Sequence, residues 1–570
     1  MKKLIYKALI VLLAVIITFT GLNSFAATGY TYDHNKKVIY STEGLIYDHS
    51  FDGLKLGMGY AGLISPEDLF VYRDKATYTV QNMYITDSAT TILGNIGAIY
   101  ELDANFNLLR SINSFKFNPG LKDESGNYVF SDDVLKHMKN NGTALLADTS
   151  AEGIQAFRDA GEIDLIIKAP RSTFRYVVEK LANHPEYLYV CDYGNNQALV
   201  IDYATDEIKL VITDPNGDVP ASVFSAQSFQ PKKVVADNAG RIYIIADGVY
   251  EGILQFDPDG TYKRFTGVNY ITLTAWNIFW LTIATEAQYE NKQQYINTTF
   301  TGMALDITGT FIYSTANPIV NDNGGYNTLS MIKKLNPAGK DVLRRNGYFP
   351  PQGDITYIAS SPSGAPYPVG PSSFNCIAVN EYGVYTVVDN NRNKLFTYDA
   401  EGNLLYISSE SGSYSNTLST PVAIQYDGDD LLVLDKGTKE IKVFVPTEIG
   451  GYINDATAAE STGDVDDAAA KWAKVIQYNA NYEYAYVGVG KGYLKNKDYK
   501  NAMEYFRQGS NKLQYSEAYK LYRNNLIKRY APIVLYSIIG LVVIVKVTKL
   551  ILKKTGHLKV KEKEQEDLGE

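Results

Sequence analysis

The stretch from Phe229 to Gly267 restricts the possible folds of this chain more than any other part of the sequence. It contains three short apolar runs, Val234–Ala236, Ile242–Ala246 and Gly252–Phe256, and each run is followed by turn residues such as Asp and Gly. Short β-branched and aromatic runs between Gly, Asp and Pro residues are typical of antiparallel strands joined by tight turns. The stretch therefore predicts an antiparallel β-meander.

Related units occur along most of the chain. Each clear unit has an apolar strand, a Gly turn, an aromatic strand that often ends in Asp, and a final hairpin with the pattern D-x-x-G. The second and fifth units depart most from this pattern, and the fifth has Ser314-Thr315 where others have Asp. The seven units begin near Ser65, Asn118, Tyr187, Phe229, Thr301, Phe374 and Ser419.

A series of short antiparallel units can hide its strand edges by closing into a ring. The sequence therefore predicts an all-β propeller over residues 27–446, with seven blades favoured and six blades as the alternative. Closure of the ring requires that the first and last blades be joined. The early strand-like runs around Val38–Tyr47 are the candidates for this role.

One insert, at about 269–297, interrupts the series of β units. Trp276, Phe279, Trp280 and Ile283 lie close together in it, with a spacing that favours a helix over a strand. The helix either covers one face of the propeller or packs against the edge of a blade.

After Pro446 the apolar residues recur with a helical period. Trp472 in one expected helix corresponds to Phe506 in another, 34 residues later, which is the period of tetratricopeptide repeats. This spacing predicts a helical domain over 449–530, with repeats at about 449–482 and 483–516 and a capping helix after them. The expected core positions of these repeats are Trp472, Tyr486, Gly490, Tyr493, Ala502 and Phe506.

Both ends of the chain carry membrane signals. Residues 1–26 begin with Met1-Lys2-Lys3 and continue with an apolar run and the small-residue site Ser24-Phe25-Ala26, which is typical of a secretory signal peptide, with an uncleaved anchor as the alternative. Residues 531–552 predict a transmembrane helix, with a buried soluble helix as the alternative, and the lysine-rich tail 553–570 suits the cytoplasmic side. We expect a single-pass protein of the cell membrane with the bulk of the chain extracellular.

The repeated strand, Gly turn, Asp-ended strand and D-x-x-G hairpin resemble the NHL-repeat family. The resemblance covers about Tyr30 to Phe444 and extends to the branch in which the propeller is fused to helical repeats and a membrane anchor in Gram-positive bacteria. It implies a non-enzymatic scaffold or sensor.

Six aspartates are expected at the ends of corresponding strands, and they are the candidate ligand-binding residues. A ring of carboxylates at one end of the propeller would bind a cation or sugar hydroxyls. The alternative is that each carboxylate accepts hydrogen bonds from the N–H groups of its own turn. The six residues are Asp87, Asp148, Asp192, Asp247, Asp389 and Asp435.

Other catalytic and metal-binding patterns are missing from the sequence. The chain has no Gly-rich phosphate loop, HExxH, GxSxG or CxxC motif, and its five histidines are scattered. Cys191 and Cys376, the two cysteines, lie in different repeats and are expected to be buried thiols. A net charge of −9 gives no basic field for nucleic acid. We therefore expect no catalytic residues, metal site, cofactor or nucleic-acid partner.

These observations favour a binding, scaffold or sensor module at the cell surface, with a glycan, a peptide or a protein as its ligand. The alternative is a metal-dependent propeller lactonase or lyase, in which carboxylate ligands or a histidine base would meet in the central channel. The sequence does not determine which side chains converge there.

Overall fold

The computed structural model describes residues 29–556, except 60–61, 76, 90–96, 124, 141–148, 216–228, 270–295, 321–324 and 359–368. The chain forms two compact units, Met1–Thr462 and Gly463–Glu570. The predicted signal peptide, Asp148 and nearly all of the predicted helical insert lie outside the described residues, as does most of the charged tail.

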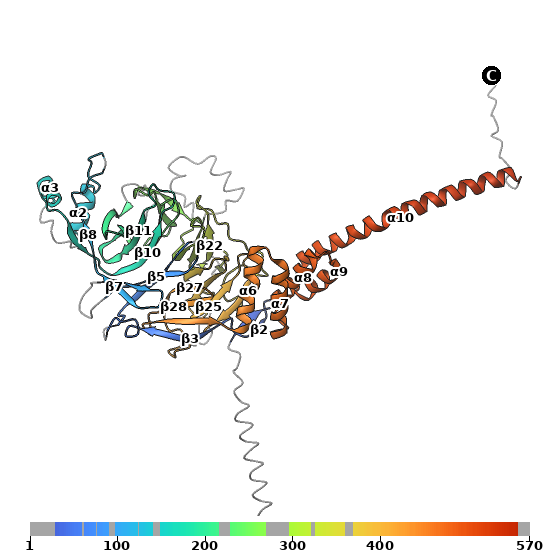
Figure 1. The fold of residues 1–570 in the computed structure, drawn as a ribbon, viewed down its shortest axis with the longest axis horizontal. Coiled ribbons are helices and arrows are strands. Elements are labelled where there is room, and N and C mark those ends of the chain that lie inside the picture. Colours follow the sequence, from blue (N-terminus) through green and yellow to red (C-terminus); the bar gives the residue numbers. More distant parts are fainter. Residues whose placement is uncertain are drawn as a thin grey trace, which may run out of the picture. The chain divides into compact units, whose positions relative to one another are not determined.

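The described strands of the first unit form a β-propeller of six blades (Figure 1). Within a blade, consecutive strands pair antiparallel, as the meander pattern predicts. The first blade is β4(Pro66–Arg73), β5(Val80–Asp87), β6(Ala98–Asp103) and β7(Leu108–Ile112). The second is β10(Pro170–Val177), β11(Glu186–Asp192), β12(Gln197–Asp202) and β13(Glu207–Ile212). The third is β14(Gln230–Ala236), β15(Ile242–Asp247), β16(Ile253–Phe256) and β17(Tyr262–Thr266).

The fourth blade has three paired strands among the described residues. It corresponds to the fifth predicted unit, which begins near Thr301 and has an irregular sequence. It consists of β18(Phe300–Leu305), β19(Ile312–Ala316) and β22(Ile332–Leu335), with the hairpin β20(Ile319–Val320) and β21(Tyr326–Asn327) between the last two. The fifth blade is β23(Phe374–Val379), β24(Tyr385–Asp389), β25(Lys394–Tyr398) and β26(Leu404–Ser408). The sixth begins with β27(Pro421–Asp427), β28(Asp430–Asp435) and β29(Glu440–Pro446).

The ring is closed by β3(Leu45–Asp52), which pairs antiparallel with β29 and so becomes the outermost strand of the last blade. The predicted closing role of the early strands is confirmed from Leu45 onward. The earlier run is β2(Val38–Tyr40), and it pairs with β1(Tyr30–Tyr32) in a separate two-stranded sheet. Joining strands from both ends of the propeller leaves no gap between the first and last blades.

The second predicted unit is not a blade, which is why six blades are present and not the favoured seven. Its residues form β8(Ser114–Phe117), α2(Asp132–Asn140), α3(Ala151–Asp159) and β9(Ile163–Ile166). Strand β8 pairs with the outer strand β13 of the second blade, and β9 pairs with β8 (Figure 1). The apolar residues of this segment share one core cluster with residues of the first and second blades, and in it the rings of Phe117 and Phe130 lie 4.8 Å apart.

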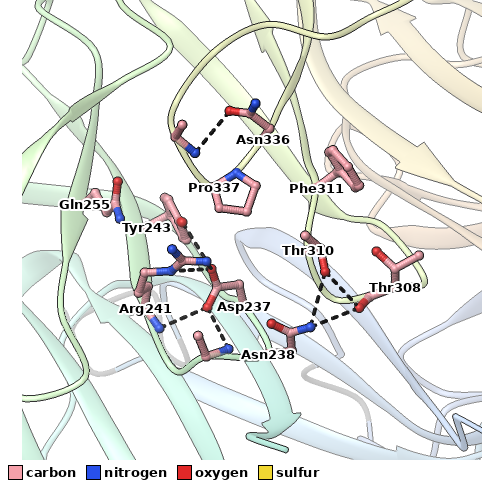
Figure 2. Close-up of polar contacts among 12 residues, drawn as sticks. Asp237, Asn238, Arg241, Tyr243, Gln255, Thr308, Thr310, Phe311, Asn336 and Pro337 are labelled. Carbon is pink, nitrogen blue, oxygen red and sulfur yellow. Dashed lines mark hydrogen bonds and ion pairs between the residues drawn. The ribbon is translucent and has the colours of Figure 1, made fainter. Parts of the chain in front are cut away.

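The residues of the D-x-x-G hairpins form one recurring type of turn. Asp237 accepts hydrogen bonds from the N–H groups of Ala239 (2.9 Å) and Arg241 (3.1 Å), and Gly240 has a φ of +79°, a conformation that glycine adopts at no steric cost. Asn336 caps an equivalent turn in the fourth blade (Figure 2).

The turns of neighbouring blades are also joined to each other. Figure 2 shows Asn238 beside the turn of the fourth blade, where its amide donates to Thr310 Oγ1 (3.2 Å) and its backbone N–H donates to the Gly309 carbonyl (2.8 Å). Asp237 is fully buried. It accepts a hydrogen bond from the Tyr243 hydroxyl and forms an ion pair with Arg241. The contacts of Asn238 join the third and fourth blades at one end of the propeller.

The first helix after the propeller, α6(Glu448–Thr462), belongs to the first compact unit. Thr447 Oγ1 donates to the Glu43 carbonyl (2.8 Å), and the Tyr406 hydroxyl donates to Asn454 (3.0 Å). The division between the two units therefore follows Thr462, whereas the sequence placed the start of the helical domain at about 449.

The second unit contains α7(Val465–Tyr478), α8(Glu483–Lys495), α9(Tyr499–Gln508) and α10(Lys512–Lys554), and each helix packs against the next. Trp472, Ala502 and Phe506 are completely buried. Gly490 lets α8 approach the Phe506 ring, because a Cβ there would lie 2.6 Å from Cε1. The predicted core residues Tyr486 and Tyr493 are half-buried, and both rings contact that of Tyr505. Assignment to the tetratricopeptide class stays a prediction.

Helix α10 is 43 residues long and joins the predicted capping helix to the predicted membrane span without interruption. Among the described helices it alone has the length and apolar composition to cross a membrane, with a mean hydropathy of 2.2 in its most apolar window. Its apolar residues are exposed along the whole segment, so they have no soluble core to occupy. The helix fits a C-terminal membrane anchor.

Candidate functional site

The structure places five of the six candidate aspartates at equivalent positions. Each ends the second strand of its blade and lies opposite the first residue of the innermost strand, as Asp87 does opposite Pro66 and Asp435 opposite Pro421. The same register holds for Asp192, Asp247 and Asp389. The fourth blade has Ala316 at this position. The aspartates therefore surround the N-terminal mouth of the central channel, which we define as the end where the innermost strands begin.

The buried carboxylates at this mouth are bonded within their own blades. Asp87 accepts hydrogen bonds from the N–H groups of Ile64 (2.7 Å), Ser65 (2.8 Å) and Ala89 (3.1 Å). Asp389 is bonded in the same way by the loop that leads into its innermost strand. These bonds agree with the structural alternative left open by the sequence. Ligand binding by the ring of aspartates stays a prediction.

Two members of the ring differ from the others. Burial raises the pKa of Asp192 to about 6, although hydrogen bonds from Asn195, Gln197 and the Lys168 N–H lower it. The Asp247 side chain is 43% exposed, and it lies 3.2 Å from Lys232 Nζ. Asp247 is thus the described member whose carboxylate is most available to solvent.

The six innermost strands surround the channel, and each contacts its neighbour around the ring. At the N-terminal mouth they line a cavity of about 240 Å³. Ion pairs cross this cavity between blades: Glu67 binds Arg171 (2.5 Å) and Lys436 (2.6 Å), and Asp68 binds Lys233 (2.6 Å). The charges of the N-terminal mouth therefore largely neutralise one another and tie four blades together.

Both cysteines are free and buried, as the sequence predicts. Cys376 lines the N-terminal cavity, and Cys191 is in the second strand of the second blade. Burial raises the pKa of both thiols, so neither is prepared to act as a thiolate nucleophile.

The other end of the channel, the C-terminal mouth, contains a pocket of about 160 Å³. Five of the six innermost strands contribute to its lining. The rings of Phe70 and Phe174 lie 4.9 Å apart, and Tyr176 stacks on Phe174 at 5.6 Å. Tyr72, Tyr78 and Tyr426 add further aromatic surface. An aromatic lining with a few polar groups is the usual composition of a small-ligand site.

The polar groups of this pocket fall into two sets. The first set consists of donors that already bond to other groups of the protein. Arg175, for example, donates to Glu186 (2.8 Å) and to the Tyr84 hydroxyl (2.9 Å). In the second set, Arg73 Nη2 and the Tyr176 hydroxyl are shielded from solvent and have no hydrogen-bond partner. Burial lowers the pKa of Arg73, while Asp427 and Glu381 act to raise it. A buried donor without a partner is costly, and a bound acceptor would remove that cost.

The C-terminal mouth is not among the sites that the sequence predicts. A signal for it was present, because Phe70 and Tyr72 alternate along one innermost strand, and Phe174 and Tyr176 alternate along the next. Residues two apart on a strand share one face. Nothing in the sequence showed that the two faces belong to one channel.

Among the described residues, no group of three or more histidine, cysteine, aspartate or glutamate side chains is placed to hold a metal ion. The lactonase or lyase alternative requires such a ligand set or a histidine base in the channel. His137, for comparison, lies beside the Asn195 carbonyl (3.2 Å) and is not among the residues lining either mouth.

No family model and no curated protein matches this sequence. Solved structures resemble it at low identity. A β-propeller domain from Myceliophteria thermophila is 12% identical, with 71% of this chain and 100% of that chain covered and a TM-score of 0.34. A catalytically inactive virginiamycin B lyase from Staphylococcus aureus with quinupristin is 9% identical (67% and 95%; TM-score 0.34). An auxiliary nutrient binding protein from Bacteroides ovatus is 10% identical (68% and 71%; TM-score 0.31). The function is therefore argued from the residues of this chain.

Proposed function

We propose that this protein is a membrane-anchored β-propeller that binds a glycan, peptide or protein ligand outside the cell without converting it. The observation that carries this proposal is the pocket at the C-terminal mouth, where aromatic rings from separate blades surround polar groups that lack partners. Concave sites of this composition bind ligands. The ion pairs between four blades at the other mouth leave fewer free groups there.

The propeller is further proposed to consist of NHL-type repeats, and the helices after it to be tetratricopeptide-like. The repeated Asp-capped turns support the first assignment. The complete burial of Trp472 and Phe506, 34 residues apart, supports the second. A short helical array of this kind gives a second surface on which a protein partner would bind.

The location outside the cell is tested by protease treatment of intact cells. The apolar segment of α10 and the signal-like residues 1–26 bracket the propeller. We expect protease to remove the propeller from intact cells while a short C-terminal fragment stays protected. Digestion of the propeller only after lysis would contradict the proposed topology.

Binding is tested with the full chain in detergent micelles on glycan and peptide arrays, with and without EDTA. Tyr78 is 41% exposed at the rim of the pocket, so Tyr78→Ala should weaken the binding of a true ligand by about tenfold without unfolding the protein. Tyr414→Ala is the matched control, because this ring is 79% exposed and lies outside the pocket.

Retained binding in EDTA is the expected result. Metal-dependent hydrolysis of a lactone panel, abolished by EDTA, would instead support the lactonase or lyase alternative and contradict a purely binding role. Equal binding by the Tyr78→Ala and Tyr414→Ala variants would show that the pocket is not the site.

A further inference from the structure

Arg73 is the cation of the C-terminal mouth that has hydrogen-bond donors to spare. It is the last residue of β4, and its Nη1 makes one long contact with the Val71 carbonyl (3.5 Å). Its Nη2 has no partner. The other lining cations are engaged: Arg175 binds Glu186, and Lys75 binds Glu179 (2.9 Å). The two terminal nitrogens of a guanidinium match the spacing of two oxygens on an anionic group.

The acidic side chains near Arg73 do not form an ion pair with it. Asp306 is bonded by the N–H groups of Thr310 and Phe311 in its own turn, and Asp74 accepts hydrogen bonds from Thr77. Asp427 and Glu381 act on Arg73 through space only, Asp427 the more strongly, and Glu381 also lines the pocket. The pocket thus presents the guanidinium of Arg73, which has a free donor, and the half-buried carboxylate of Glu381, which can accept hydrogen bonds.

The ligand must fit all of these groups together. Flat aromatic faces pack well against the C–H face of a sugar ring, and the ring of Tyr78, which is 41% exposed, is available in the lining for such a contact. Glu381 would accept hydrogen bonds from hydroxyl groups but repel a bare anion, so hydroxyls and negative charge are required on one molecule. The Tyr176 hydroxyl, also without a partner, adds a donor near the same wall.

We propose that the C-terminal mouth recognises an acidic saccharide, whose carboxylate, sulfate or phosphate group is bound by the guanidinium of Arg73. This inference rests on the proposed binding function and assigns a ligand class to it. Arg73 contributes specificity for the charged group, the aromatic wall packs against the ring, and Glu381 binds hydroxyls. Neutral sugars of the same shape lack the group that satisfies Arg73.

The test uses the full chain in detergent micelles and ligand-observed NMR titrations. The probes are glucuronate, glucose 6-sulfate and glucose 6-phosphate, with glucose as the neutral control. At least one charged probe should bind about tenfold more tightly than glucose. Comparison of the three charged probes identifies which anion is preferred.

Arg73→Gln should abolish this preference, whereas Arg73→Lys should restore part of it. Lys263→Gln is the control for nonspecific surface charge, because this side chain is 58% exposed and lies outside the pocket, and it should keep the preference. Melting curves verify that each variant is folded. The preference of the wild-type chain for charged over neutral probes tests the inference even when a variant does not fold.

Each failure has its own signature. Equal affinity for glucose and for all charged probes, or a preference that survives Arg73→Gln, overturns the saccharide inference. If the array ligands still depend on Tyr78 in that case, the proposed binding function stands. Binding of an acidic peptide that depends on Arg73, with no binding of the sugars, overturns the assigned ligand class. Loss of both the array signal and the probe signal overturns both proposals.

Discussion

Replacing Asp435 by alanine is expected to destabilise the propeller by about 3–5 kcal/mol. Its carboxylate accepts hydrogen bonds from the N–H groups of Ser419 (2.8 Å), Thr420 (2.9 Å) and Gly437 (3.0 Å). It also faces Lys442 Nζ at 3.5 Å, and both side chains are completely buried. Alanine would leave an ammonium group buried without its counter-charge and three N–H groups without their acceptor.

The measurement is hydrogen exchange of β27 and β28, followed by mass spectrometry of the full chain. Asp247→Ala is the matched control, and it should cost no more than about 1 kcal/mol because the side chain is 43% exposed. The double variant Asp435→Ala, Lys442→Met should be more stable than Asp435→Ala alone. Similar small effects of Asp435→Ala and Asp247→Ala would show that the buried carboxylate is not structural, and would favour the ligand-binding role.

Replacing Trp472 by alanine is expected to destabilise the second unit by about 3–5 kcal/mol. The indole is completely buried between α7 and α8, where the Tyr484 ring lies 5.2 Å away and the Tyr482 ring 6.2 Å away. Gly488 approaches it so closely that a Cβ would lie 2.0 Å from Cδ1.

Faster hydrogen exchange in α7, α8 and α9 would report this loss, while the blades of the propeller keep their protection. Tyr478→Ala lies on the same helix as Trp472 and is the control, since its ring is 52% exposed and its removal should change little. An exchange pattern in Trp472→Ala that equals that of Tyr478→Ala would remove Trp472 from the core.

The blades were predictable where the signals were local. The meander of the third blade and the D-x-x-G turns follow from strand period and turn chemistry within a few residues. The second predicted unit failed because its apolar residues resemble those of a blade, although they form helices and an added hairpin at an outer edge. The innermost strand of the second blade is β10, Pro170–Val177. The sequence prediction missed this strand, because it placed the start of the third unit at Tyr187, after β10.

The site was less predictable than the fold because a channel is a property of the closed ring. The aspartates could be found, since each ends a strand, but their hydrogen bonds to their own loops required the loop geometry. Arg73 and Tyr176 are separated by about one hundred residues, and the interval includes the segment that was misread as a blade. Their lack of partners is visible only after every neighbouring strand has been placed.

The pairing of β3 with β29 has a consequence for the order in which the chain is made. Strand β3 leaves the ribosome long before β29, and at roughly 5–20 residues per second it waits tens of seconds for its partner. An unpaired strand during that time is an open edge that other chains can join. Strand β3 contains Asp48, His49, Ser50 and Asp52, and such polar residues discourage pairing between unfinished chains. We therefore expect the composition of this strand to limit the aggregation of newly made protein until its own last blade has been made.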